Sequence, residues 1–338
     1  MKDNNFSTYL SAYFLKYMPT RTGYSSNTIE SYRDAFIIFL RYCSDELKIK
    51  PEKIDFSLIN RNMIEKYLVW IENKKKCSIS TRNHRLAALQ SFFRYIQLEA
   101  PEQMELCNTI LSIKSKKMPA TEMNYISIEG IKLLLSIPNI EIKSERRNLA
   151  VLALMYDTGG RVQEIADLKI SDIRIKSPST IRLMGKGSKT RVIPLVPQTV
   201  SILKKYMTDY DLFDLSKRNL PLFFNKKNEK LTRAGLSYIL SKYTKKAMHN
   251  NRELFPSKVT AHVLRHSKAM HLLQSGVNLI YIRDFLGHAS VTTTEIYAKS
   301  NPEIKRKAIE EASAEVLPDE KFSVEEKEDL FDWLKKSI

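Results

Sequence analysis

Glycine, cysteine and tryptophan are scarce in this sequence. Its 338 residues include nine glycines, three cysteines and two tryptophans. So little glycine is typical of a mainly helical protein, because glycine destabilises helix interiors. An odd number of cysteines, Cys43, Cys77 and Cys107, each within an apolar helical pattern, argues against a disulfide framework and predicts buried, reduced thiols.

Long apolar runs are also missing. No stretch reaches the roughly 18 apolar residues that a membrane-spanning helix needs. The opening residues MKDNNFSTYL lack the apolar core of a secretion signal. Together with the reduced thiols, these absences predict a cytoplasmic protein that has no membrane partner.

Positive charge is in clear excess. The chain has 55 Lys and Arg against 38 Asp and Glu, a formal net charge of +17, with an isoelectric point near 9.5. A solvated basic surface is one explanation, but such an excess usually indicates a polyanionic partner, most often nucleic acid. The excess belongs to residues 1–302, because residues 303–338 carry 11 acidic and 7 basic side chains. We therefore expect a basic body followed by an acidic tail.

The stretch 260–297 carries the densest set of reactive side chains. His262 and Arg265 are three residues apart, so they share one face of a helix. A second polar cluster runs from His288 to Tyr297, after a Ser-Gly helix stop and a further apolar run. Arginine neutralises phosphate oxygens, histidine handles protons, and tyrosine can act as a covalent nucleophile. This combination favours phosphate chemistry.

Each of these residues also has a plainer explanation. Tyr297 is one of 16 tyrosines, and most tyrosines lie in a core or on a surface. His262 and His266 are spaced like zinc ligands. However, a zinc-protease helix would have glutamate where this chain has Val263. Arg265 between the two imidazoles would also repel a cation, so we expect neither a metal nor a cofactor.

The ordered set H-x-x-R, L-G-H and a tyrosine nine residues later resembles the C-terminal signature of the tyrosine recombinase (phage integrase) family. Residues 157–164, DTGGRVQE, resemble the T-G-x-R-x-x-E box of that family, with glycine at position 160 in place of the usual large apolar residue. Residues 185–194, GKGSKTRVIP, resemble its G-K-G-x-K-x-R-x-x-P hairpin. Strands are expected on either side of the turn, at 180–184 and 191–195.

This resemblance implies catalytic roles for six residues and supporting roles for two. The catalytic set is Arg161, Lys186, His262, Arg265, His288 and Tyr297, and the supporting residues are Glu164 and His266. By the same resemblance, the two arginines neutralise the phosphate, His262 is the general base, and Lys186 protonates the leaving 5′ oxygen. His288 would hydrogen-bond a phosphate oxygen, and Tyr297 would form a 3′-phosphotyrosine.

Apolar residues at helical spacing predict four or five helices in residues 1–111, and these resemble the family's helical core-binding domain. The predicted helices include one that starts at residue 6 and ends near Pro19, one starting at residues 25–27, one at 57–73, and one starting at residues 78–80. We expect a mainly α fold with a small β-sheet. It comprises an N-terminal helical core-binding (SAM-like) domain at 1–111, a basic linker at 112–124 and a C-terminal α+β catalytic domain at 125–302. Tail helices at 303–338 would fold back or dock on a neighbouring protomer.

Polar and basic residues at helix starts, in the linker and around the hairpin are candidates for DNA contacts. They are Thr28, Tyr32, Arg82, His84, Arg85, Lys116, Lys117, Lys189, Arg191, Thr232 and Arg233. Taken one at a time, each also fits an ordinary solvated face.

The sequence as a whole predicts a site-specific DNA recombinase or integrase of the bacterial nucleoid. The resemblance implies double-stranded DNA with inverted-repeat core sites, a tetramer in the synaptic complex, a monomer when free, and work for a mobile element. Two alternatives remain open: a type IB topoisomerase-like enzyme, and a non-catalytic DNA-binding regulator of the same fold. The small size and the C-terminal helix argue against the first, and the filled catalytic positions argue against the second.

Overall fold

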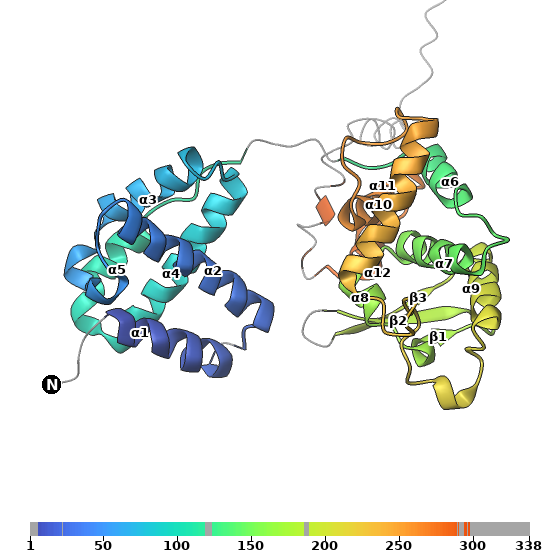
Figure 1. Cartoon of the computed structure of the whole chain (residues 1–338), viewed down its shortest axis with the longest axis horizontal. Helices are drawn as coiled ribbons and strands as arrows, with labels where there is room; N and C mark the ends of the chain where they lie inside the picture. The colour runs from blue at the N-terminus through green and yellow to red at the C-terminus, as the bar shows by residue number, and fades with distance from the viewer. Residues whose placement is uncertain are drawn as a thin grey trace, which may run out of the picture. The chain divides into compact units, whose positions relative to one another are not determined.

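The computed structural model describes residues 6–21, 23–118, 124–185 and 189–288, together with residues 290, 294, 295 and 297. The chain forms two compact units, Met1–Thr121 and Glu122–Ile338 (Figure 1). The expected tail helices at 303–338 lie outside the described residues. Within the described part, no helix is long and apolar enough to cross a membrane.

The first unit is helical throughout. Its helices are α1 (Phe6–Ala12), α2 (Ser26–Asp45), α3 (Arg61–Asn73), α4 (Ile79–Glu99) and α5 (Met104–Leu111), with shorter helical segments at Tyr13–Arg21, Pro51–Lys53, Phe56–Leu58 and Pro101–Gln103. The starts of α2, α3 and α4 are capped by the side chains of Ser25, Asn60 and Ser78, which accept backbone N–H groups in the first turn. The sequence therefore determines where these helices begin.

Two boundaries differ from the prediction. The first helix was expected to end near Pro19, but a π-helical segment continues from α1 through that residue to Arg21. The third helix was expected from Ser57, whereas α3 begins at Arg61. The reason is the cap at Asn60, which separates α3 from the short 3₁₀ turn that precedes it.

Aromatic packing around α4 holds the first unit together. The ring of Phe92 meets those of Phe6, Tyr13 and Phe36 edge to face, with centroids 5.3 to 5.4 Å apart. All four side chains are at most 2% exposed. Because one face of α4 is buried in this way, its polar first turns lie at the surface beside α2.

The second unit contains the sheet and the remaining helices. The helices are α6 (Ile128–Ser136), α7 (Lys143–Thr158), α8 (Val162–Ala166), α9 (Pro197–Asp209), α10 (Arg233–Asn250), α11 (Ala261–Gln274) and α12 (Leu279–Leu286), and the strands are β1 (Ile173–Arg174), β2 (Thr180–Met184) and β3 (Thr190–Pro194). Within this unit, Figure 1 shows the sheet at one end and α6 at the other. The fold class is therefore mainly α with a small sheet, as the sequence predicts.

The sheet is antiparallel, in the order β1-β2-β3. The predicted hairpin is present, with Thr180 opposite Pro194 and Met184 opposite Thr190. The alternate residues Ile181 and Leu183 of β2 are buried, while their neighbours are not. Strand β1 was not predicted, because two residues are too short to show an alternating pattern.

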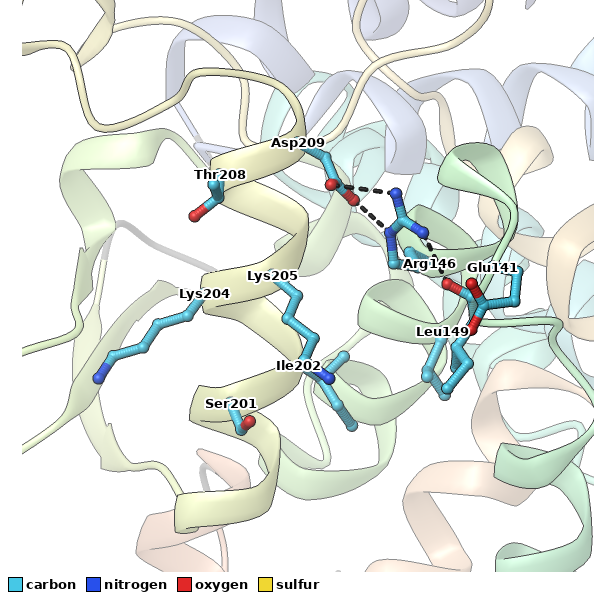
Figure 2. A pocket seen from close by; sticks show the side chains of 10 residues that line it. Glu141, Arg146, Leu149, Ser201, Ile202, Lys204, Lys205, Thr208 and Asp209 are labelled. Atoms are coloured by element: carbon cyan, nitrogen blue, oxygen red, sulfur yellow. Dashed lines mark hydrogen bonds and ion pairs between the residues drawn. The ribbon is translucent and has the colours of Figure 1, made fainter.

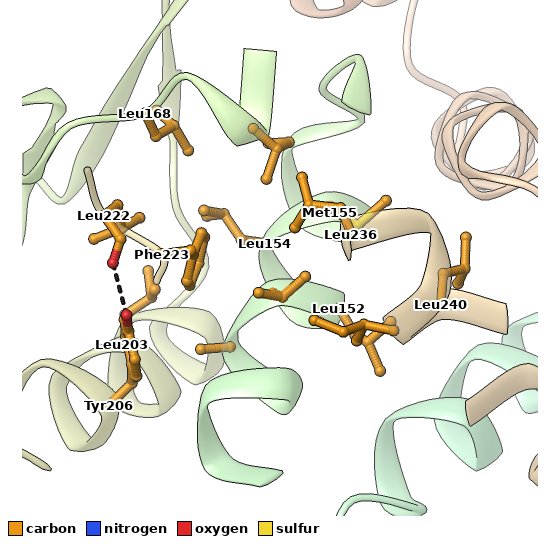
Figure 3. Packing of buried hydrophobic residues seen from close by; sticks show 14 of the residues in the cluster. Leu152, Leu154, Met155, Leu168, Leu203, Tyr206, Leu222, Phe223, Leu236 and Leu240 are labelled. Atoms are coloured by element: carbon orange, nitrogen blue, oxygen red, sulfur yellow. Dashed lines mark hydrogen bonds between the residues drawn. The ribbon is translucent and has the colours of Figure 1, made fainter. Parts of the chain in front are cut away.

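Helix α7 runs through the core of the second unit. Its apolar side chains pack with residues of α9 and α10 and of the segments that follow α8 and α9 (Figure 3). The labelled members of this cluster are Leu152, Leu154, Met155, Leu168, Leu203, Tyr206, Leu222, Phe223, Leu236 and Leu240. The buried Tyr206 hydroxyl donates to the Leu222 carbonyl at 2.7 Å. This packing fixes the C-terminal end of α7, immediately before the predicted Arg161 box.

Candidate active site

Helix α11 carries three of the predicted residues near its N-terminal end. The Thr260 side chain caps the helix by accepting the Val263 N–H. His262 and His266 are one turn apart, and their ring centroids lie 4.1 Å from each other at 69°. The structure therefore brings both imidazoles to one face of α11, as their spacing predicts.

Arg265 is buried, with an exposed fraction of 3%. It donates to the Gly159 carbonyl at 2.8 Å and to the Leu286 carbonyl at 2.7 Å. Burial, followed by the charge of Arg161, lowers its pKa to about 10, which still leaves the guanidinium charged at neutral pH. Arg265 thus ties α11 to the ends of α7 and α12 and holds a fixed positive charge between them.

Arg161 stands at the start of α8 and is more open. Its backbone N–H donates to Glu164 Oε2 at 2.9 Å, and its Nη1 donates to Oε1 at 2.8 Å. Its Nη2 donates to the Gly287 carbonyl at 3.2 Å. The Arg161 side chain is nevertheless 43% exposed, so it remains accessible to an anion.

Arg191 completes the set of ion pairs around Glu164. Its Nη2 and Nη1 donate to the two carboxylate oxygens at 2.6 and 3.1 Å, and its Nε donates to the Phe285 carbonyl at 3.0 Å. Burial of Glu164 opposes ionisation, but the hydrogen bonds from Arg191 and Arg161 lower the pKa of the carboxyl. The expected phosphate contact of Arg191 remains a prediction, because protein groups engage its donors in this arrangement.

His288 follows the left-handed turn at Gly287, where φ is +66°. Its Nδ1 lies 3.0 Å from the Thr294 hydroxyl. Burial, followed by the charges of Arg265 and Arg161, lowers the pKa of His288 to about 4, so the ring is neutral at pH 7.

Tyr297 lies against His266 and His288 and is only 1% exposed. Its hydroxyl is 2.8 Å from His266 Nδ1, and its ring stacks on that of His288 with centroids 6.3 Å apart and planes 8° apart. Burial raises the pKa of Tyr297, although Arg265 opposes that rise, so the phenol is protonated at pH 7. The tyrosine, the imidazoles and Arg265 are therefore gathered in one unit of a single chain.

A cleft of about 480 Å³ opens beside this cluster. Its lining includes Arg161, Arg233, His262 and Arg265, with the hydroxyl residues Ser237 and Thr260. Three guanidinium groups lining one cleft are a donor set that suits a polyanion such as a phosphodiester. The structure thus brings the DNA-contact candidate Arg233 next to the candidate catalytic arginines.

Two supporting residues were not recognised from the sequence. Lys268 on α11 lies 3.3 Å from the Asp157 carboxylate on α7, and both side chains are largely buried. The other Asp157 oxygen accepts the Val196 N–H, just before α9, at 3.1 Å. This network fixes α11 against α7. The Asp157 position was visible in the T-G-x-R-x-x-E box, but its partners are distant in sequence.

The remaining candidates of the second unit are placed as follows. Lys186 lies outside the described residues. Lys189 is exposed beside the hairpin turn, and its carbonyl accepts the Gly185 N–H. Thr232 caps α10, so its side chain has a structural role. A separate hollow of about 500 Å³, next to α9 and crossed by the Arg146–Asp209 ion pair, contains none of the predicted residues (Figure 2).

In the first unit, α2 and α4 bring several DNA-contact candidates together. The rings of Tyr32 and His84 meet at 5.9 Å, and a hollow of about 480 Å³ lined by His84 and Arg85 lies between the two helices. Thr28 contacts the capping residue of α2.

Three candidates of this unit, Arg82, Arg85 and Lys116, already have protein partners. Arg82 donates to the side chain of Asn83 at 3.0 Å, and Arg85 donates to Cys77 Sγ at 3.0 Å. Lys116 pairs with Glu72 at 3.0 Å, while Lys117 is exposed.

A helical unit, a cleft lined by arginines and a histidine, and a buried tyrosine in contact with a second histidine from the same helix as the first are the features expected of a tyrosine recombinase. Comparison with known proteins agrees with this class. Residues 124–303 match the Phage integrase family, and residues 10–100 match the N-terminal SAM-like domain of phage integrases. The chain belongs to the phage integrase family and is a tyrosine recombinase, an enzyme of site-specific recombination.

Individual relatives support this assignment. The tyrosine recombinase XerD of Oceanobacillus iheyensis is 30% identical over 84% of this chain and 91% of its own. The crystal structure of the site-specific recombinase XerH bound to palindromic difH substrate, a post-cleavage complex, is 26% identical, with a TM-score of 0.67 over 85% of this chain and 79% of its own. The Tn1549 transposon integrase shares the fold, with a TM-score of 0.67 at 16% identity over 88% of this chain and 97% of its own.

Proposed function

We propose that this recombinase cleaves and rejoins DNA through a covalent 3′-phosphotyrosine formed by Tyr297. The observation that carries the proposal is the 2.8 Å contact between the Tyr297 hydroxyl and His266, beside a cleft lined by Arg161 and Arg265. A nucleophile, a proton acceptor and fixed positive charge are the three groups that attack on a phosphodiester requires.

The arginines would make the phosphate susceptible to attack. A phosphodiester resists nucleophiles because it is an anion. Arg161 and Arg265 would neutralise its non-bridging oxygens, and their forked donors match the charge that develops as phosphorus becomes five-coordinate. His288 would donate a hydrogen bond to the same oxygens. Glu164 would act through Arg161, which it holds by ion pair and backbone contact.

The bond changes would be as follows. The Tyr297 hydroxyl gives its proton to a neighbouring imidazole as its oxygen forms a bond to phosphorus. The bond between phosphorus and the 5′ oxygen breaks, and that oxygen leaves as a hydroxyl after it takes a proton. Lys186 is the proposed proton donor, by resemblance to the family. The phosphotyrosine retains a phosphodiester bond, so a second 5′ hydroxyl can reverse the step and join a different strand. The step needs neither a nucleotide nor a redox partner.

The DNA partner would be a duplex with inverted-repeat core sites, bound by a tetramer that assembles from monomers. Two features support this. The relative XerH was crystallised on a palindromic substrate, and both units here present basic residues beside hollows, at His84 and Arg85 in one and Arg233 in the other. The reaction would take place in the cytoplasm, on nucleoid or element DNA. The tail at 303–338 would fold back or dock on a neighbouring protomer.

We further propose that the reaction serves integration, excision or transposition of a mobile element. Trapping the covalent adduct on fragmented genomic DNA and sequencing the attached ends would test this. Ends that map to the boundaries of an element would support the proposal. Ends that map to a single chromosomal site without flanking element genes would contradict it.

The covalent step has a direct test. The wild-type protein is incubated with a duplex that carries the captured site and a nick beside it, so that cleavage releases a short strand and traps the adduct. We expect an adduct with the wild type and none with Tyr297→Phe. Tyr281→Phe is the matched control, because Tyr281 is 71% exposed and should react normally.

The two alternatives predict other outcomes. A non-catalytic regulator would bind the captured site without forming an adduct. A topoisomerase-like enzyme would form the adduct and relax supercoiled DNA, but it would not exchange strands between two duplexes. The proposal requires both the adduct and the exchanged products.

A further inference from the structure

The two imidazoles of α11 have different surroundings. His262 lines the cleft together with Arg161 and Arg265. His266, one turn further along the helix, has its Nδ1 at 2.8 Å from the Tyr297 hydroxyl, and its ring centroid is 5.5 Å from that of the tyrosine. His262 therefore lines the cleft, whereas His266 contacts the oxygen of the candidate nucleophile.

The environment of His266 determines its protonation. The titratable and charged groups that face it are His262 and Arg265 on its own helix and His288 and Tyr297 from the segment after α12. Burial, followed by His262, Arg265 and His288, lowers the pKa of His266 to about 4. At pH 7 the ring is therefore neutral, and one of its two nitrogens is free of a proton.

We infer that His266, not His262, is the catalytic residue that accepts the Tyr297 proton during cleavage. This inference rests on the proposed function, because it gives a partner to the nucleophile assigned there. His266 would carry its proton on Nε2, so that Nδ1 accepts the hydrogen bond of the phenol. His262 then serves as a donor to the phosphate in the cleft.

The step balances as follows. The O–H bond of Tyr297 breaks and its proton moves to His266 Nδ1, while the oxygen forms its bond to phosphorus. The bond to the 5′ oxygen breaks with its electron pair on that oxygen, which takes a proton from the proposed acid. In the joining step the flow reverses, and His266 returns the proton to the phenol. No oxidant, reductant or net proton is consumed.

The test is the pH dependence of single-turnover adduct formation by the full chain on the nicked duplex. With a neutral base in contact, wild-type cleavage should be nearly independent of pH between 6 and 9. In His266→Asn, the amide oxygen can occupy the position of Nδ1 and hold the hydroxyl, but it cannot accept the proton. Cleavage must then use the small fraction of Tyr297 that is already ionised to phenolate. Below the tyrosine pKa this fraction rises about tenfold per pH unit, so the cleavage rate should rise by the same factor.

The size of the effect can also be stated. At pH 7, His266→Asn should cleave about 10² to 10⁴ times more slowly than the wild type, the usual contribution of general base catalysis. His262→Asn is the matched comparison on the same helix face. It should lower the rate while leaving the profile flat, because the base is still present. Thermal unfolding and DNA affinity are measured for both variants, so that misfolding is recognised.

The outcomes separate this inference from the proposed function. An absent wild-type adduct overturns the proposed function itself. A wild-type adduct combined with a flat profile in His266→Asn overturns only the inference, and a steep profile in His262→Asn would assign the base to His262. If His266→Asn does not fold, the wild-type profile decides, since a rate that rises tenfold per pH unit would show that no neutral base is acting.

Discussion

Glu164 and Arg191 form a two-point ion pair that is almost fully buried, with side-chain exposures of 4% and 12%. The pair joins the start of α8 to strand β3, and Arg191 continues to the carbonyl of Phe285 at the end of α12. The cleft arginine Arg161 shares the same carboxylate. The geometry of the site therefore depends on Arg191, whose donors are engaged by protein groups.

Arg191→Met should destabilise the second unit strongly. Breaking a buried ion pair costs up to about 3 to 5 kcal/mol when the remaining charge has no partner, and Arg161 would be left as the ion-pair partner of Glu164, so we expect a loss below that limit. Urea unfolding at pH 7 measures the loss. Arg182→Met is the control, because Arg182 pairs with Asp172 but is 56% exposed, and such pairs contribute about 0 to 1 kcal/mol. Equal losses of unfolding free energy in the two variants would contradict the stabilising role assigned to the buried Arg191 ion pair.

Gly287→Ala should impair cleavage more than it impairs folding. Gly287 has φ of +66°, and an added Cβ would come within 2.9 Å of Arg191 Nη1. The side chain would push on Arg191 and shift the turn that carries His288. Gly276→Ala provides the comparison, since its φ is +80° but nothing lies within 4 Å of the added atom.

Both glycine variants share the backbone penalty of a left-handed alanine, about 1 kcal/mol. Only Gly287→Ala should also lower the single-turnover cleavage rate, measured on the nicked duplex. If Gly276→Ala slowed cleavage to the same extent, strain alone would explain the effect, and the contact with Arg191 would have no role.

Arg161→Lys and Arg265→Lys should each bind DNA but cleave it poorly. Lysine carries the charge but cannot reproduce the forked contacts of arginine. The loss of a hydrogen-bond donor that stabilises the transition state lowers the rate of the chemical step by a factor of about 10² to 10³. Arg252→Lys is the control, because Arg252 also donates to two carbonyls, at 3.1 and 3.2 Å, in the loop after α10. Filter binding and adduct formation are measured on all three variants.

The free energy of unfolding should fall as the pH is lowered from about 6.5 to 4.5. His266 and His288 have folded-state pKa values of about 4, against about 6.5 in an unfolded chain. Because the unfolded state takes up protons first, stability is highest above pH 6.5, declines through this window, and levels off below the folded pKa. Urea unfolding across the window measures the slope.

His266→Asn should have a shallower slope than the wild type, since it removes one of the depressed groups. The window ends at pH 4.5, close to where carboxylates begin to titrate, so the difference between the two proteins reports the histidine. An identical slope would mean that the ring is not held neutral in the folded protein.

Local patterns predicted much of the fold and part of the site. The predicted cap at residues 25–27 marked the start of α2, where Ser25 caps the helix, and the glycine-framed turn predicted the hairpin of β2 and β3. The shared face of His262 and His266 follows from their spacing of four. Each of these features depends on residues within one or two turns of each other.

What the sequence did not predict depends on contacts between distant residues. The partners of Arg191 lie 27 and 94 residues away, and the hydroxyl of Tyr297 meets a histidine 31 residues earlier. Such contacts require the reversal of the chain at Gly287 and the packing of α11 on α7, and neither leaves a periodic signal. The ion pair of Arg191 and the contact of His266 with Tyr297 were therefore not visible in the sequence.

The most direct measurement is the location of the DNA on the trapped protein. The adduct is digested with trypsin and nuclease, and mass spectrometry identifies the peptide that carries the nucleotide and the end through which it is attached. The account predicts a 3′-phosphate on Tyr297. A nucleotide on any other side chain, or attachment through a 5′-phosphate, would contradict it.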